Sequence, residues 1–136
     1  MQYQINSIKS ISDKQIAMLE QEGINTAEAL LRAARTPADR RELARTTGIE
    51  EMKLFKWVNY ADLSRIDGLE PDLTALLEQA GITTMLDLRG RSPFSLHSKL
   101  VSLNKQQQVV SFVPDMLQVA DMVNHAKTLE PEVAYQ

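Results

Sequence analysis

The chain contains one stretch of sequence twice, and this internal repeat constrains the fold more than any other feature. Residues 18–26 read MLEQEGINT, and residues 76–84 read LLEQAGITT. Aliphatic residues precede both stretches at the same spacing, since Ile8 and Ile11 correspond to Ile66 and Leu69. Such self-similarity predicts two copies of one structural unit of about sixty residues.

The boundaries of the two units follow from the alignment of the copies. The first unit is expected over residues 1–65 and the second over 66–128, while residues 129–136 are predicted to form a flexible tail. The chain has 136 residues, a length that suits one domain or two very small ones. Because neither unit alone carries much apolar sequence, we expect the two to pack as one compact domain.

Helix signals dominate both units. Only five Gly and five Pro occur, and no segment alternates apolar and polar residues for long enough to predict a strand. Gly23, Gly48 and Gly81 are expected in left-handed conformations just beyond helix ends. Pro114 should interrupt a helical segment that Asn104 caps, so that a separate last helix follows it. We therefore predict an all-α fold of eight or nine short helices in two tandem helical-hairpin repeats.

Charged residues are unevenly distributed, although the net charge is only −3. Residues 32–65 hold eight Arg or Lys and five Asp or Glu, whereas residues 66–88 hold five acidic residues and no basic one. One interpretation of the basic stretch is a solvated surface on which arginines pair with Asp39 and Glu42. The alternative is a nucleic-acid-binding face, whose candidate residues are Lys14, Arg32, Arg35, Arg40, Arg41 and Arg45.

The residue types of most catalytic and metal sites are scarce. The chain has no Cys, which excludes disulfides, thiolate metal sites and a cysteine nucleophile. His97 and His125 fall on different predicted helices, and neither has a second His or a carboxylate at the spacing of a metal-binding motif. The sequence also lacks a phosphate-binding loop and a nucleophile elbow. We therefore expect a protein that is not an enzyme and holds no cofactor or metal.

The most apolar segment of the chain, residues 109–117, reads VVSFVPDML. We predict that it either closes the core or faces a partner helix or a second copy of the protein. In the second case a two-fold homodimer through residues 109–123 is the hypothesis. The candidate interaction residues are Val109, Phe112, Val113, Met116 and Leu117. Trp57, by contrast, is expected in the core.

Three further stretches of sequence carry a resemblance to a known family. They read LARTTGI over residues 43–49, WVNYADLSRIDGL over 57–69, and LLEQAGITT over 76–84. With these stretches the chain resembles the bacterial domain-of-unknown-function family 4332, which is grouped with helix-hairpin-helix proteins. The resemblance covers roughly residues 8–125. It implies an all-helical tandem hairpin fold and no established activity.

A helix-hairpin-helix binds DNA through a Gly-x-Gly turn, whose backbone N–H groups approach a phosphate. The second copy has Gly68, but Glu70, Pro71 and Asp72 follow it. Two carboxylates repel phosphate and Pro has no N–H, so we read this turn as structural. The first copy has neither Gly at this turn, where its hydroxyls, on Ser10 and Ser12, and Lys14 would contact a phosphate only weakly.

Together these observations predict a non-enzymatic protein-interaction or scaffold module, with nucleic-acid binding through residues 32–65 as the disfavoured alternative. The expected partner is another protein or a second copy of the chain. No apolar run approaches the ~20 residues that span a bilayer. The first residues, Met1 to Gln4, lack the basic and apolar regions of a signal peptide. We therefore expect no membrane association and a cytoplasmic location.

Overall fold

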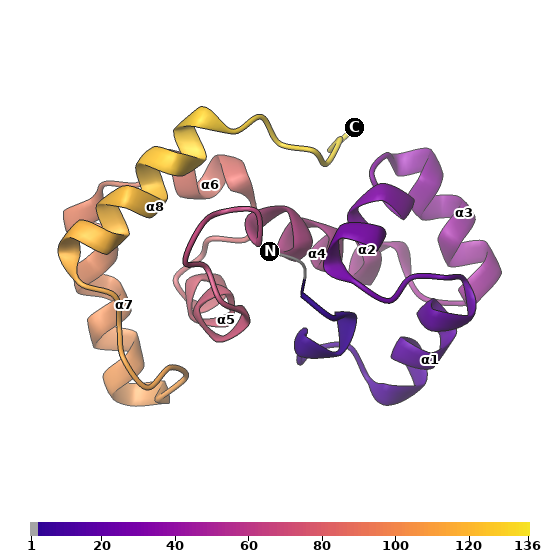
Figure 1. Cartoon of the computed structure of the whole chain (residues 1–136), viewed down its shortest axis with the longest axis horizontal. Coiled ribbons are helices and arrows are strands. Elements are labelled where there is room, and N and C mark those ends of the chain that lie inside the picture. The colour runs from indigo at the N-terminus through magenta and orange to yellow at the C-terminus, as the bar shows by residue number, and fades with distance from the viewer. Residues whose placement is uncertain (1–2) are drawn as a thin grey trace. The chain divides into compact units, whose positions relative to one another are not determined.

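The computed structural model describes residues 3–136, and all the secondary-structure elements named over these residues are helices (Figure 1). The all-α fold class predicted from the sequence is confirmed. The helices are η1 Ile5–Ser7, a short 3-10 turn, α1 Asp13–Gln21, α2 Ala27–Ala33, α3 Pro37–Thr47, α4 Glu51–Leu63, α5 Pro71–Gln79, α6 Met85–Arg89, α7 Pro93–Gln107 and α8 Met116–Thr128.

The chain divides into two compact units. The first comprises the chain up to Asp62 together with Pro131–Gln136, and the second comprises Leu63–Glu130. Each unit has its own cluster of buried hydrophobic residues. The sequence suggested that neither unit carries enough apolar residues for much of a core. The structure differs, because the aliphatic residues of each repeat build a core within that repeat.

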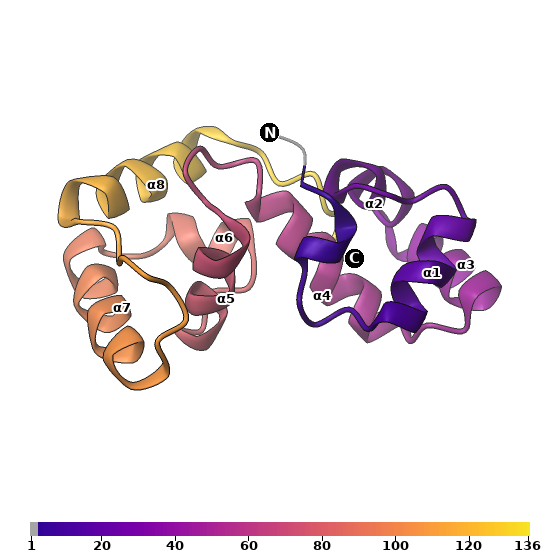
Figure 2. The same ribbon diagram turned by 60° about the horizontal axis from the view of Figure 1, so that its bottom comes forward.

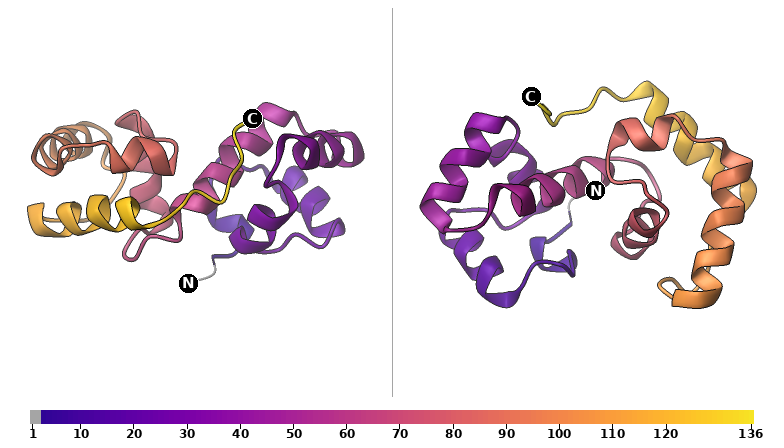
Figure 3. Two further views of the ribbon diagram at one scale, coloured as in Figure 1. Left: turned by 90° about the horizontal axis from the view of Figure 1, so that it is seen from above. Right: turned by 180° about the vertical axis from the view of Figure 1, so that it is seen from behind.

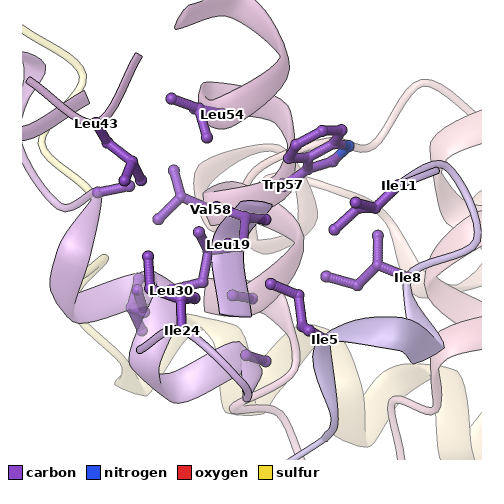
Figure 4. Packing of buried hydrophobic residues seen from close by; sticks show 14 of the residues in the cluster. Ile5, Ile8, Ile11, Leu19, Ile24, Leu30, Leu43, Leu54, Trp57 and Val58 are labelled. Carbon is purple, nitrogen blue, oxygen red and sulfur yellow. The ribbon is translucent and has the colours of Figure 1, made fainter. Parts of the chain in front are cut away.

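The core of the first unit gathers around α4. Figure 4 shows Trp57 of this helix beside Val58 and Leu54, with Ile11 close to the indole ring. The Trp57 side chain is 1% exposed, and its Nε1–H donates to Ser10 Oγ at 3.1 Å. The prediction that Trp57 belongs to the core is therefore confirmed.

The core of the second unit is built by α5 to α8. The last helix packs on both α6 and α7, and α5 also contacts α7; α7 and α8 lie side by side in Figures 2 and 3. From α8, Val119, Met122, Val123 and Ala126 are buried, at the spacing of one helix face. The opposite, solvated face of α8 includes Leu117 and Asp121.

Left-handed glycines follow the ends of α1, α3 and α5. Gly23, Gly48 and Gly81 have φ values of 82°, 77° and 87°, which confirms the prediction. At the first site the Ile24 N–H donates to Leu19 O at 3.0 Å, and the Gly23 N–H donates to Glu20 O at 3.0 Å. Ile82 and Gly81 make the same two bonds to α5. This pair of bonds is the Schellman motif, which satisfies carbonyls at the helix end.

Threonine side chains begin the following helices. Thr26 Oγ1 accepts from the Ala29 N–H, and Thr84 Oγ1 accepts from the Asp87 N–H, both at 3.0 Å. The Asp87 carboxylate in turn accepts from Thr83 and Thr84. Burial raises the pKa of Asp87, but these hydrogen bonds together lower it by more than burial raises it. The net effect is a pKa below the usual value of an aspartate.

The C-terminal segment differs from the flexible tail that the sequence predicted. Val133 is buried, and the Ala134 N–H donates to Arg35 O at 2.8 Å. The Tyr135 ring meets Phe55 edge to face, with 6.1 Å between the ring centres. The polar sequence of this segment suggested fraying, but hydrogen bonds and one buried valine hold it on the first unit.

The connection between α7 and α8 also differs from the prediction. Asn104 does not cap a helix but lies inside α7, where its side chain accepts from the Val110 N–H at 3.0 Å and donates to Val110 O at 2.9 Å. Residues 108–115 therefore form an ordered loop and not a helix (Figure 1). As predicted, a separate helix, α8, follows Pro114.

The left-handed glycines give a stability prediction. A Cβ at Gly48 would meet no atom within 4 Å, so Gly48→Ala isolates the backbone cost of a positive φ. We expect it to lower the free energy of unfolding by about 1 kcal/mol. Gly90 has φ −87° and provides the matched control, because Gly90→Ala should leave stability unchanged or slightly higher. Urea denaturation of both variants is the measurement, and equal effects would contradict the prediction.

Candidate functional site

The two sets of candidate residues from the sequence fall in different units. The six basic residues belong to the first unit, and the five apolar residues belong to the second. Each set is therefore described on its own.

Arg40 is the member of the basic set that the structure removes from any binding face. Its side chain is buried, with the residue 4% exposed. The guanidinium donates to Ala34 O, Arg35 O and Ala134 O at 2.9, 3.0 and 2.7 Å. It also lies over the Phe55 ring, 4.9 Å from the ring centre. The prediction of Arg40 as a nucleic-acid contact is thus corrected: this arginine fastens the C-terminal segment to the first unit.

The environment of Arg40 leaves it charged. Desolvation by burial lowers the pKa of the guanidinium, while the nearby carboxylates of Asp39 and Glu51 raise it. An arginine side chain stays protonated in proteins even after such a shift. Three backbone carbonyls accept hydrogen bonds from this charged group. Hydrogen bonds from a charged donor are stronger than those between neutral groups.

Two other arginines of the set are paired on the surface. Arg32 Nη1 lies 2.7 Å from Glu28 Oε1, and Arg45 Nε donates to Glu42 at 3.1 Å. The hydrogen bond from Arg45, and its charge, lower the pKa of Glu42. The expected pairing with Glu42 is therefore confirmed. Lys14, Arg35 and Arg41 are exposed, so these three keep the position that the nucleic-acid alternative requires.

The apolar set contains the most exposed large hydrophobic side chains of the second unit. Phe112 is 90% exposed and Leu117 is 76% exposed. Val113 and Met116 are half-buried, and Val109 packs against the core of the unit. The alternative in which this segment closes a core is thus wrong for Phe112, which lies exposed on the loop after α7, and for Leu117, which lies on the solvated face of α8.

Beside Phe112 the second unit is hollowed by a groove of about 820 Å³. Four parts of the unit form it: the turn before α5, the first turn of α5, the loop between α7 and α8, and one face of α8. The lining residues are Asp67, Gly68, Glu70, Asp72, Leu73, Val110, Ser111, Phe112, Val113, Pro114, Gln118, Asp121, Met122 and His125. We call this feature the acidic groove.

The acidic groove combines an apolar floor with exposed carboxylates. Leu73 and Met122 are buried, whereas Asp67, Glu70 and Asp121 are exposed. Asp72 is the fourth carboxylate of the lining, and none of the lining residues is Lys or Arg. An adjoining hollow shares Asp72 and residues 110–113 with the groove, and its lining includes Lys105.

One hydrogen bond joins two walls of the acidic groove. The Asp67 N–H donates to His125 Nδ1 at 3.3 Å, which ties the turn before α5 to α8. The sequence analysis missed Asp121, Met122 and His125 as groove residues. Their spacing along one face of α8 and the acidic stretch 66–88 were the available signals, but which elements meet depends on tertiary packing.

No three His, Asp or Glu side chains within residues 3–136 are grouped as metal ligands. In the same part of the chain, no helix combines the length and apolar character that crossing a bilayer requires.

Comparison with known proteins identifies the family. A family model described as "Domain of unknown function (DUF4332)" matches residues 9–129. The match spans most of the chain, so the chain belongs to this family. Searches of curated proteins and of solved structures found no match.

The structural role of Arg40 can be tested against its neighbour. Arg40→Ala removes the donor of three carbonyls, and we expect it to lower the free energy of unfolding by about 3 kcal/mol. Arg41 is exposed and next in sequence, so Arg41→Ala should change stability by no more than about 0.5 kcal/mol. Thermal or urea unfolding measures both, and a neutral Arg40→Ala would refute the assigned role.

The nucleic-acid alternative has its own test. With Arg40 buried and Arg32 and Arg45 paired to carboxylates, we expect no submicromolar binding of duplex or single-stranded DNA at physiological salt. Fluorescence anisotropy with a labelled oligonucleotide, at two salt concentrations, is the measurement. Tight binding that falls steeply with salt, and that Arg35→Ala with Arg41→Ala weakens, would reverse the ranking of the two functions.

Proposed function

We propose that this member of the family is a non-enzymatic protein-interaction module that binds its partner through the acidic groove of the second unit. One observation carries the proposal: Phe112 is 90% exposed at the edge of a groove with an apolar floor. Transfer of a Phe side chain from water into an apolar contact is worth about 1.5–3 kcal/mol. A partner that covers Phe112 would gain this energy.

The loop that carries Phe112 is held in shape before any partner arrives. Both polar atoms of the Asn104 amide bind the backbone of Val110, and Val110 and Val113 pack against the core of the unit. Such preorganisation favours binding, because little conformational entropy is lost when the partner docks. Aromatic side chains are also enriched at protein interfaces, where a few residues supply most of the binding energy.

The repeated architecture supports the helix-hairpin-helix likeness that we propose for the two units. In each repeat a short helix ends at a left-handed Gly, an Ile is buried, and a Thr caps the next helix. At the hairpin turn of the second unit, Glu70 and Asp72 stand where a DNA-binding hairpin needs neutral, N–H-rich backbone. We therefore propose a scaffold use of this fold, in the cytoplasm of a bacterium, with the partner a protein.

The proposal predicts which aromatic residue a partner requires. Phe112→Ser should leave the unfolding midpoint unchanged, since the side chain is exposed, but abolish retention of specific proteins in a pull-down from a nuclease-treated lysate. Phe94 is 69% exposed and lies outside the acidic groove, so Phe94→Ser is the matched control and should retain the same proteins. Equal retention by Phe112→Ser and the wild type would sink the proposal.

A further inference from the structure

We infer that the acidic groove binds a cationic amphipathic segment of another protein, one with apolar side chains on one side and Lys or Arg beside them. The inference rests on the proposed function, because it specifies the chemistry of the partner. Its first support is the composition of the lining, which holds four carboxylates and no Lys or Arg. Charge complementarity of this kind selects partners and speeds their encounter.

The arrangement of the lining fits two sides of such a segment. Leu73 and Met122 form a buried apolar floor, while Asp67, Glu70 and Asp121 are exposed beside it. Apolar side chains of the partner would rest on the floor and against Phe112. Long Lys or Arg side chains would reach outward to the carboxylates, since their stems are apolar and only the tips are charged.

The turn before α5 argues against an anionic partner on this face. Asp67, Glu70 and Asp72 surround it, and Pro71 at the first position of α5 has no N–H. Phosphate would therefore meet repulsion where a helix start would otherwise attract it. The same turn attracts a cation.

A two-fold homodimer through this face is disfavoured by the same charges. A two-fold axis places one surface against its own copy. The carboxylates of Asp67, Glu70 and Asp121 would then face a second set of the same carboxylates, and juxtaposed like charges weaken an interface. The homodimer hypothesis for residues 109–123 thus gives way to a partner of opposite charge.

The test uses two labelled synthetic peptides with one apolar face in common. Both carry Leu at the spacing of one helix face, and the remaining positions are Lys in one peptide and Glu in the other. Fluorescence anisotropy with the full chain measures their dissociation constants. We expect the Lys peptide to bind about tenfold or more tightly than the Glu peptide at low salt, with the difference shrinking as salt rises.

Variants separate the groove from the general negative charge of the chain. Asp67→Asn with Asp121→Asn should weaken binding of the Lys peptide about fivefold, and Phe112→Ser should weaken it further. Glu20→Gln with Glu22→Gln changes the net charge equally at exposed sites of the first unit and should have little effect. An unfolding curve of each variant checks that the variant remains folded.

Four results would overturn the inference. Equal binding of both peptides, weakened by Phe112→Ser, would leave the proposed function intact and remove the charge requirement. Equal loss with the groove and control variants would show attraction by net charge alone. Absence of binding by the Lys peptide would exclude this chemistry, and the pull-down with Phe112→Ser would then judge the proposed function separately. Dimers seen in light scattering that Phe112→Ser dissolves would identify a second copy as the occupant.

Discussion

The structure depends on one recurring constraint, a glycine in the left-handed conformation followed by a buried aliphatic residue. Gly23, Gly48, Gly68 and Gly81 all have positive φ, and the residues after them, Ile24, Ile49, Leu69 and Ile82, are all buried. Helices of seven to thirteen residues, such as α2 and α4, are marginal alone in water. They persist because the turns at Gly23, Gly48 and Gly81 satisfy carbonyls at a helix end, and because all four turns place an apolar side chain in the core.

This constraint explains why the sequence predicts the fold well. Glycine as a helix stop and the burial of Trp57 are both predicted from the sequence and confirmed by the structure. Asn104 was misread because an amide that caps a helix and one that binds a following loop look alike in sequence. The packed C-terminal segment was missed because its partner, Arg40, lies 94 residues away along the chain.

The candidate site was predictable only in part, because it too depends on contacts between residues far apart in the sequence. Phe112 and Leu117 stand out as apolar residues in the sequence. The exposure of Phe112 depends on the loop that Asn104 holds, and the exposure of Leu117 depends on which face α8 turns to the core. Asp67 and Asp121 come together only when the turn before α5 meets α8. The two copies thus differ. In the first unit, buried Arg40 binds the C-terminal segment. The second unit has a groove with an apolar floor and carboxylates at its edge.

Phe112 is exposed to solvent on an ordered loop, where a partner can contact it. The chain has no Cys, so Phe112→Cys introduces one unique thiol whose reaction rate with a maleimide reports access to the site. The account predicts labelling within about tenfold of the rate in denaturant, while Leu69→Cys in the core reacts only as fast as the unit opens. Equally slow labelling of both thiols in the folded chain would place residue 112 in a core and contradict the account.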